Sequence, residues 1–279
     1  TPYEVDELFI TLRFLREQGT SIVIITHKLK ETMNVADRVM VLRNGVLIHD
    51  DVKPADTNPQ ELSEMMVGRL IQLEARHPSP RIGGVKFSVK NLTVKDERGC
   101  EKVKDVSFDI REGEILGIAG ITGSGQRELL EAIAGLQTME AGSSIRFMPP
   151  GKEEVELVGK SPLDIYQLGV GLAFVPEDRF GMGLVGSMDL SDNVMLRSYK
   201  CGKSAFTDRK TPRALAQKIV DELEVVTPSL NIPLRRLSGG NVQKVLVGRE
   251  IASEPSLLMS AYAVRGLDIN TSYTIYRLL

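Results

Sequence analysis

Glycines, two hydroxyl side chains and an arginine follow a short apolar run in residues 120–127. Glycine leaves backbone N–H groups accessible, and the positive end of a following helix favours negative charge, so such a segment can hold a phosphate group. The spacing is that of a phosphate-binding loop, GxxxxGK[ST]. We therefore expect phosphate contacts from Gly120, Thr122, Gly123, Ser124, Gly125, Gln126 and Arg127.

The last two residues of this loop depart from the motif. Gln126 stands where a lysine would reach the terminal phosphates, and Arg127 stands where a hydroxyl group would hold Mg²⁺. Both charge neutralisation and metal positioning are therefore altered. Taken alone, the segment could also be an ordinary glycine turn.

A second glycine pair lies at an expected helix start, in the sequence LSGGNVQK of residues 237–244. A hydroxyl group and two glycines at the positive end of a helix offer backbone donors to a phosphate. The candidate binding residues here are Ser238, Gly239, Gly240 and Gln243. Taken alone, this segment could be an ordinary helix cap.

A histidine follows a run of β-branched residues. Residues 22–25 read Ile, Val, Ile, Ile and are followed by Thr26 and His27. This pattern is typical of a buried parallel strand that would carry His27 at its carboxyl end. His27 could instead have a purely structural role. Arg179 and Arg265 are further candidate functional residues, and the alternative for both is a surface ion pair.

The elements that must position these residues fall into two parts. The first part is predicted to contain a helix, the strand just described, a second helix, a hairpin and a third helix, over residues 3–17, 21–25, 29–35, 38–49 and 54–68. Prolines and glycines then interrupt any regular element, so residues 77–84 are predicted to be a linker.

Past this linker, strands alternate with helices. The predicted strands are residues 85–94, 103–110, 114–119, 171–175 and 257–259. The predicted helices are residues 126–134, 211–223 and 241–252. Such alternation predicts an α/β fold with a mostly parallel core sheet and an added antiparallel layer.

Composition excludes several classes of protein. Hydrophobic residues make up 42% and charged residues 26% of the 279 residues, as in ordinary globular proteins. The formal charge of -2 gives no sequence-independent attraction to nucleic acid, so we expect no nucleic-acid partner. Two separated cysteines, Cys100 and Cys201, fit a reducing compartment, and we expect no metal cluster. No apolar run approaches the ~20 residues of a membrane helix.

Together these motifs resemble the ATP-binding subunits of ABC transporters. The resemblance is to tandem subunits that carry two nucleotide-binding domains and serve import of simple sugars and nucleosides. It rests on the loop 120–127, on LSGGxxQK, on the switch-histidine segment of residues 24–31, which contains His27, and on Pro176, Glu177, Asp178 and Arg179. It implies an ABC-type P-loop NTPase with a helical signature subdomain.

The resemblance also implies how the chain is organised. Residues 1–76 look like the C-terminal part of a first nucleotide-binding domain, and residues 85–279 look like a second domain truncated at its C-terminus. ATP and Mg²⁺ would bind mainly in a composite site, between the phosphate loop of one domain and the signature of the other. His27 would contact the γ-phosphate there.

Some residues depart from the family's pattern. No aromatic residue between Leu92 and Val103 can stack on adenine, and Ala261 and Tyr262 replace the Asp-Glu pair that holds Mg²⁺ and activates water. The second domain is therefore expected to have a degenerate site, and the fragment alone to be inactive.

The implied partners are transmembrane permease subunits, a second nucleotide-binding domain or a second copy of the subunit, and indirectly an extracellular substrate-binding protein. The implied place is peripheral, at the cytoplasmic face of the plasma membrane. The rival function is a soluble, non-transport ABC protein that acts as a nucleotide-dependent clamp or regulator. A non-catalytic binding module is a third reading.

One structural expectation follows from the apparent truncation. The strand over residues 21–25 is predicted to insert between the strands over 114–119 and 257–259, giving a circularly permuted domain with His27 near Gly123 and Tyr262.

Overall fold

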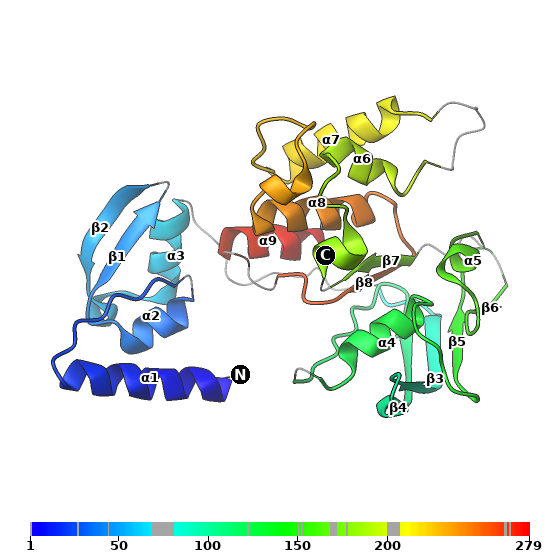
Figure 1. The fold of residues 1–279 in the computed structure, drawn as a ribbon, viewed down its shortest axis with the longest axis horizontal. Coiled ribbons are helices and arrows are strands. Elements are labelled where there is room, and N and C mark those ends of the chain that lie inside the picture. Colours follow the sequence, from blue (N-terminus) through cyan, green and yellow to red (C-terminus); the bar gives the residue numbers. More distant parts are fainter. Residues whose placement is uncertain are drawn as a thin grey trace. The chain divides into compact units, whose positions relative to one another are not determined.

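The computed structural model describes residues 2–26, 28–43, 45–68, 81–121, 123–149, 151, 153–167, 172–176, 178–199, 207–264, 267 and 269–279. Contacts divide the chain (Figure 1) into one unit of Thr1–Arg76 with Asp268–Tyr276 and another of His77–Leu267 with Arg277–Leu279. The assignment of residues 1–76 and 85–279 to two nucleotide-binding domains, joined by a linker over 77–84, stays a prediction.

The first unit contains a hairpin and several helices. Its elements are α1 (Pro2–Glu17), α2 (Leu29–Val35), β1 (Val39–Arg43), β2 (Val46–Val52), the 3₁₀ turn η1 (Pro54–Asp56), α3 (Pro59–Val67) and most of α9 (Ile269–Leu278). Helix α3 begins at Asn58, whose side chain accepts the Glu61 N–H at 3.0 Å, and ends at Gly68 in the left-handed region. These caps confirm a helix within residues 54–68.

The strand predicted over residues 21–25 is wrong. The segment is extended but belongs to no sheet, and Val23 and Ile25 are 92% and 96% exposed. Residues 114–119 likewise form no strand, and Ile115 and Ile118 are exposed. Neither segment forms a strand, and among the described residues the sheet that contains β8 (Leu257–Ser260) has β7 (Leu172–Val175) as its other strand, so the predicted insertion and permutation are also wrong. β-Branched residues favour a strand only when a partner strand supplies hydrogen bonds.

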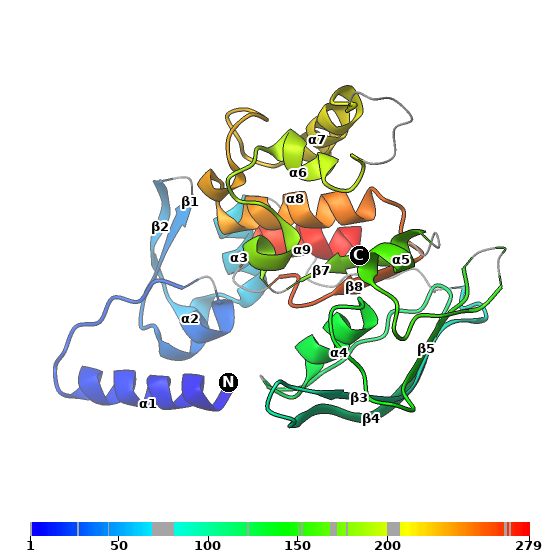
Figure 2. The same cartoon turned by 45° about the vertical axis from the view of Figure 1, so that its right-hand side comes forward.

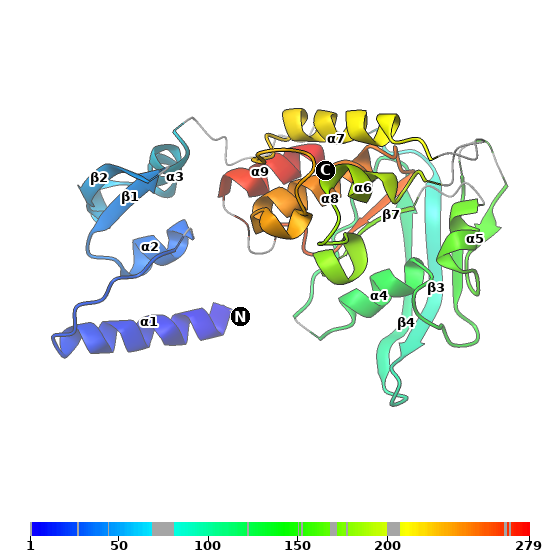
Figure 3. The same ribbon diagram turned by 45° about the horizontal axis from the view of Figure 1, so that its top comes forward.

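The second unit contains an antiparallel sheet in the order β4-β3-β5-β6. Its strands are β3 (Val85–Lys95), β4 (Glu101–Arg111), β5 (Ser144–Phe147) and β6 (Val155–Glu156). Helix α4 (Gln126–Ile133) packs against β3 and β4, as Figures 2 and 3 show. The antiparallel layer predicted from alternating residues is thus confirmed for β3 and β4.

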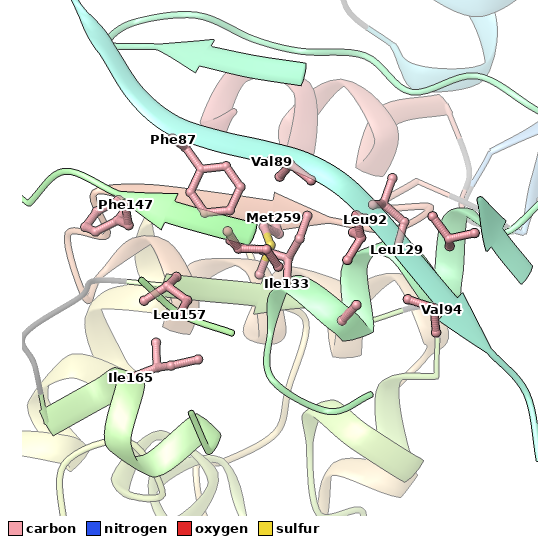
Figure 4. Packing of buried hydrophobic residues seen from close by; sticks show 13 residues of the cluster. Phe87, Val89, Leu92, Val94, Leu129, Ile133, Phe147, Leu157, Ile165 and Met259 are labelled. Atoms are coloured by element: carbon pink, nitrogen blue, oxygen red, sulfur yellow. The ribbon is translucent and has the colours of Figure 1, made fainter. Parts of the chain in front are cut away.

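One hydrophobic core joins this sheet to α4 and to β8 (Figure 4). Phe87 of β3 and Phe147 of β5 pack edge to face, with ring centroids 6.4 Å apart. Leu129 and Ile133 of α4 enter the same cluster, and so does Met259 of β8. This packing fixes the start of α4, where the glycine-rich loop lies.

The remaining elements surround the parallel pair β7–β8. They are α5 (Pro162–Gln167), the π-helical turn η2 (Arg179–Gly183), α6 (Leu190–Met195), α7 (Lys210–Glu222), the 3₁₀ turn η3 (Leu234–Arg236) and α8 (Gly239–Ile251). Helix α8 lies between the α6–α7 pair and the β7–β8 pair (Figures 1 and 2). None of the described helices has the length and apolar character of a membrane span.

Buried charges hold α8 in this layer. Arg249 is buried, and burial lowers the pKa of its guanidinium group. It donates to Glu250 Oε1 at 2.6 Å and to the Gly183 carbonyl at 2.8 Å. Arg197 donates to Glu250 Oε2 at 2.6 Å, so the Glu250 carboxylate is paired twice. Because each buried charge has a partner, the network links α8 to α6 and η2 without an unpaired ion.

Candidate functional site

The glycine-rich loop is held against β4 by Gly125. This residue precedes α4 with a φ of +93°, and a Cβ atom there would overlap the backbone carbonyl of Lys102. Two independent reasons therefore exclude a side chain at position 125: the backbone has a positive φ, and the Lys102 carbonyl takes up the space that a Cβ atom would need. The sequence needs glycine at this position to start α4 close to the sheet.

The side chain of Gln126 lies over its own loop. Its Nε2 donates to the Ile121 carbonyl at 3.4 Å, and the Ser124 N–H donates to the same carbonyl at 3.1 Å. A Cβ atom on Gly120 would collide with Gln126 Nε2. The side chain at the lysine position thus reaches back toward Gly120 and Ile121 at the start of its own loop.

Arg127 is engaged along α4. Its Nε donates to Glu131 Oε1 at 2.6 Å, and Gln137 Nε2 donates to Glu131 Oε2 at 2.9 Å. The Glu131 side chain is 5% exposed and that of Arg127 is 64% exposed. Arg127 therefore neutralises a nearly buried carboxylate one turn further along the helix.

The two residues directly after β8, Ala261 and Tyr262, carry no carboxylate. The Ala261 N–H donates to the Val175 carbonyl at 2.9 Å and extends the parallel pair by one bond. Tyr262 has a φ of +51°, a left-handed conformation that is uncommon for an aromatic residue. Among the residues that the structure describes, no group of three or more His, Cys, Asp or Glu side chains gathers as a metal site. The residues of this loop and of 261–262 thus do not fit Mg²⁺.

The start of α8 has a different geometry. Ser238 is its N-cap, and its Oγ accepts the Asn241 N–H at 3.4 Å and Asn241 Nδ2 at 3.0 Å. The N–H groups of Gly239 and Gly240 lie in the first turn, before the helix's own hydrogen bonds begin. Ser238 and Gly239 are exposed. This end of α8 can therefore present backbone donors and a positive dipole end to an anion.

Gln243 lies deeper in α8 than expected for a ligand of a phosphate. Its side chain is 1% exposed, and its Oε1 has no hydrogen-bond partner among the described residues. Its contact with a nucleotide stays a prediction. Thr122 and His27 lie outside the described residues, so their predicted roles also stay predictions.

A contact that the sequence did not predict joins Arg179 to the start of α8. Arg179 Nη1 donates to the Gly239 carbonyl at 3.2 Å, across 60 positions of sequence. Burial lowers the pKa of this guanidinium group. The motif of residues 176–179 was the one signal that could have directed attention to Arg179.

The family profile described as ABC transporter matches residues 103–260, from β4 to the end of β8. The chain belongs to the ABC transporter family. This ABC transporter chain is 38% identical, over its whole length, to 54% of the nucleoside import ATP-binding protein NupA of Lactococcus lactis. It is also 38% identical to 54% of the guanosine import ATP-binding protein NupO of Bacillus subtilis. A third relative is the glucose import ATP-binding protein TsgD13 of Haloferax volcanii, 36% identical over 99% of this chain and 49% of that protein.

The chain therefore spans about half the length of the curated relatives it matches, 54% in the case of NupA. Solved ABC cassettes share its fold. The dimeric cassette MJ0796, bound to ADP and Pi, aligns with a TM-score of 0.58 over 69% of this chain and 80% of that one, at 22% identity. The predicted ABC family and the α/β, P-loop NTPase fold of ABC type are both confirmed.

Proposed function

We propose that this chain is part of the ATP-binding, energy-coupling subunit of an ABC importer for nucleosides or simple sugars. The observation that carries the proposal is the contrast within one ABC unit: the signature start of α8 is exposed and capped, whereas Gln126 at the lysine position of the loop before α4 bonds to that loop's own backbone. Relatives named for import of nucleosides, guanosine and glucose support the substrate class.

In this proposal the signature completes a competent site whose phosphate loop belongs to another nucleotide-binding domain or to a second copy. Ser238, Gly239 and Gly240 face the terminal phosphates of ATP, and the N-terminal dipole of α8 stabilises their negative charge. Bound ATP with Mg²⁺ supplies the free energy of closure and hydrolysis. This chain's residues orient the phosphates and exclude water.

His27 is the proposed catalytic residue of that competent site. The resemblance of its segment to a switch histidine supports a contact with the γ-phosphate, where an imidazole N–H can donate to the developing charge.

The loop of residues 120–127 forms the proposed degenerate site. Gln126 cannot neutralise phosphate charge as a lysine does, Arg127 is paired with Glu131, and Ala261 and Tyr262 provide neither a metal ligand nor a base. The chain alone is accordingly proposed not to hydrolyse ATP.

The proposed partner is a membrane permease that docks on the segment after β7. Large apolar side chains are exposed along this segment, namely Phe180, Met182, Val185 and Met188. Several exposed apolar side chains in a short segment are typical of a protein interface. Docking there makes the subunit peripheral at the cytoplasmic face of the membrane, with an extracellular binding protein as an indirect partner and no nucleic acid.

The test uses the ATPase subunit that carries this chain. The tagged subunit, purified from solubilised membranes, should bring down a polytopic permease, and Ser238→Arg should lower ATP turnover at least about 100-fold because a bulky cation fills the anion-facing cap. Ser256→Arg is the matched control, since Ser256 is exposed beside β8 and away from the cap.

Two results would count against the proposal. A soluble subunit that recovers no membrane protein, yet still hydrolyses ATP, would favour the rival function of a nucleotide-dependent clamp. Turnover in Ser238→Arg equal to that in Ser256→Arg would remove the signature from the mechanism.

A further inference from the structure

The segment that follows β7 has a shape fixed by Asp178 and a glycine. Asp178 Oδ1 accepts the N–H groups of Phe180 at 3.2 Å and of Gly181 at 2.9 Å. A Cβ atom on Gly181 would collide with the Asp178 carboxylate. The turn η2 is therefore closed by its own N-cap, and a side chain at its third position would displace the capping carboxylate. We call residues 178–188 the post-strand segment.

The post-strand segment bonds to the backbone on both sides of Ser238. Before the serine, the N–H groups of Arg235 and Leu234 donate to the carbonyls of Gly186 and Met188, both at 3.0 Å. After the serine, the Gly239 carbonyl accepts from Arg179 Nη1 at 3.2 Å. The signature serine thus lies between three hydrogen bonds made by one segment.

The contact with Arg179 is close to the first glycine of the signature. A Cβ atom on Gly239 would lie 3.1 Å from Arg179 Nη1, closer than nearly all real contacts of a Cβ atom. The first glycine of the signature therefore admits the guanidinium group as well as exposing a backbone donor. A side chain at position 239 would therefore require Arg179 to shift by a few tenths of an ångström.

The position of Arg179 is electrostatically unusual. A cation at the N-terminus of a helix faces the positive end of the helix dipole and is normally disfavoured there. Donation to the Gly239 carbonyl offsets this repulsion, since a hydrogen bond from a charged donor is stronger than a neutral one. The arrangement adds positive potential beside the turn of α8 that presents its donors to an anion.

The other end of η2 is also attached to α8. Arg249 Nη2 donates to the Gly183 carbonyl at 2.8 Å. A Cβ atom on Gly183 would lie 3.2 Å from Leu246, so the turn packs closely on the middle of the helix. The post-strand segment therefore contacts α8 near its start, its middle and its end, and a displacement of one must move the other.

We propose that Arg179 is a positioning residue that holds the signature serine and the first turn of α8 in place and couples them to the post-strand segment. The proposal rests on the proposed function, in which the permease docks on this segment and Ser238 faces ATP. A shift of the docking surface then reaches the phosphate contacts through the Arg179–Gly239 bond.

The first test measures hydrogen exchange of the purified chain by mass spectrometry. In Arg179→Ala the amides of Asn241 and Val242, which bond to Ser238, should exchange about tenfold faster, as expected when one charged hydrogen bond is lost. Arg179→Lys keeps the charge and should fall between the wild type and Arg179→Ala. Arg236→Ala removes an exposed positive charge two residues before Ser238 and should exchange like the wild type.

The second measurement is steady-state ATP hydrolysis by the subunit that carries this chain. The KM for ATP should rise about tenfold in Arg179→Ala with a smaller change in kcat, because the signature binds phosphate while the base and metal ligands lie elsewhere. Arg179→Lys should recover part of the loss. A general loss of structure would instead lower kcat in proportion to the fraction of folded protein.

The outcomes separate this proposal from the proposed function. Unchanged exchange at Asn241 and Val242 in Arg179→Ala, or an equal increase across the β3–β4 sheet, would overturn the positioning role. The expected local increase in exchange, combined with no ATP turnover in the wild-type subunit, would support the positioning role and overturn the importer function.

Discussion

Two helices of the same unit, α4 and α8, begin at glycine-rich segments, and they differ in what surrounds their first turns. At the start of α4 the polar side chains bond within their own unit, because Gln126 bonds to the Ile121 carbonyl of the loop and Arg127 bonds to Glu131 further along the helix. At the start of α8 the surrounding structure holds the backbone, and Ser238 and its two glycines meet solvent.

The difference shows that a helix N-terminus is only a potential anion site. Both ends carry the same dipole and the same kind of backbone donors. What differs is whether the side chains next to the glycines leave space for a ligand. The core side of α4 is independent of this, since Leu129 and Ile133 pack on the sheet whatever the loop binds. A site can therefore lose its chemistry while its helix keeps its place.

The largest effect is expected from removing the charge that holds α8. Glu250→Ala leaves Arg249 buried without its carboxylate, so the free energy of unfolding should fall by about 3–5 kcal/mol. Urea denaturation of the purified chain measures this. Glu222→Ala, which removes an exposed carboxylate 3.7 Å from Lys218, is the control and should change stability by less than about 0.5 kcal/mol.

Glu250→Ala would destabilise α8 and leave the contacts of α4 unchanged. If Glu250→Ala and Glu222→Ala unfolded at the same urea concentration, the buried charges would not hold the helix that carries the signature.

A smaller effect is expected at the start of α4. Gly125→Ala combines a φ of +93° with overlap of the Lys102 carbonyl, and should cost about 3 kcal/mol. Gly99→Ala is the matched control, because Gly99 has a φ of +78° but no atom near a new Cβ. It should cost only about 1 kcal/mol of backbone strain.

The difference between these two variants isolates the close approach of the loop to β4. Equal costs in urea denaturation would mean that the loop moves away from Lys102 freely and that Gly125 is needed for its backbone conformation alone.

Local patterns in the sequence predicted the elements whose residues alternate or repeat over a sufficient length. The strands β3 and β4 and the helices α4, α7 and α8 lie within two residues of the predicted bounds. Of the shorter elements, β7 and β8, with four residues each, also lie within one residue of the predicted bounds, whereas β6, with two residues, and α6, with six, were not predicted.

The errors came from interactions between distant residues. Residues 21–25 and 114–119 have strand-forming composition, but a strand exists only where a neighbouring strand pairs with it. The contact between Arg179 and Gly239 depends on how two segments pack, which spacing does not report. The glycines and Ser238 could be named as candidates from the sequence. The bond from Gln126 to the Ile121 carbonyl of its own loop is visible only in the structure.

The smallest effect is expected from restoring the lysine of the loop. Gln126→Lys replaces an amide that bonds to Ile121 only at 3.4 Å, so stability should change by less than about 0.5 kcal/mol. ATP hydrolysis by the purified chain, followed as phosphate release, should remain at the level of the buffer blank. The added cation supplies one charge, but Ala261 and Tyr262 still provide neither a metal ligand nor a base, and Arg127 still pairs with Glu131.

Gln126→Ala is the matched control for this variant, since it empties the loop without adding a charge. Titration of the two variants with a fluorescent ATP analogue separates space from charge. If Gln126 only obstructs the loop, Gln126→Ala should bind the analogue more tightly than the wild type and Gln126→Lys, whose side chain is no smaller, should not. If a cation is what the loop lacks, only Gln126→Lys should bind more tightly. Phosphate release above the blank in Gln126→Lys would show that the lysine alone distinguishes the loop of α4 from a competent site, and the contrast with α8 would then reduce to a single side chain.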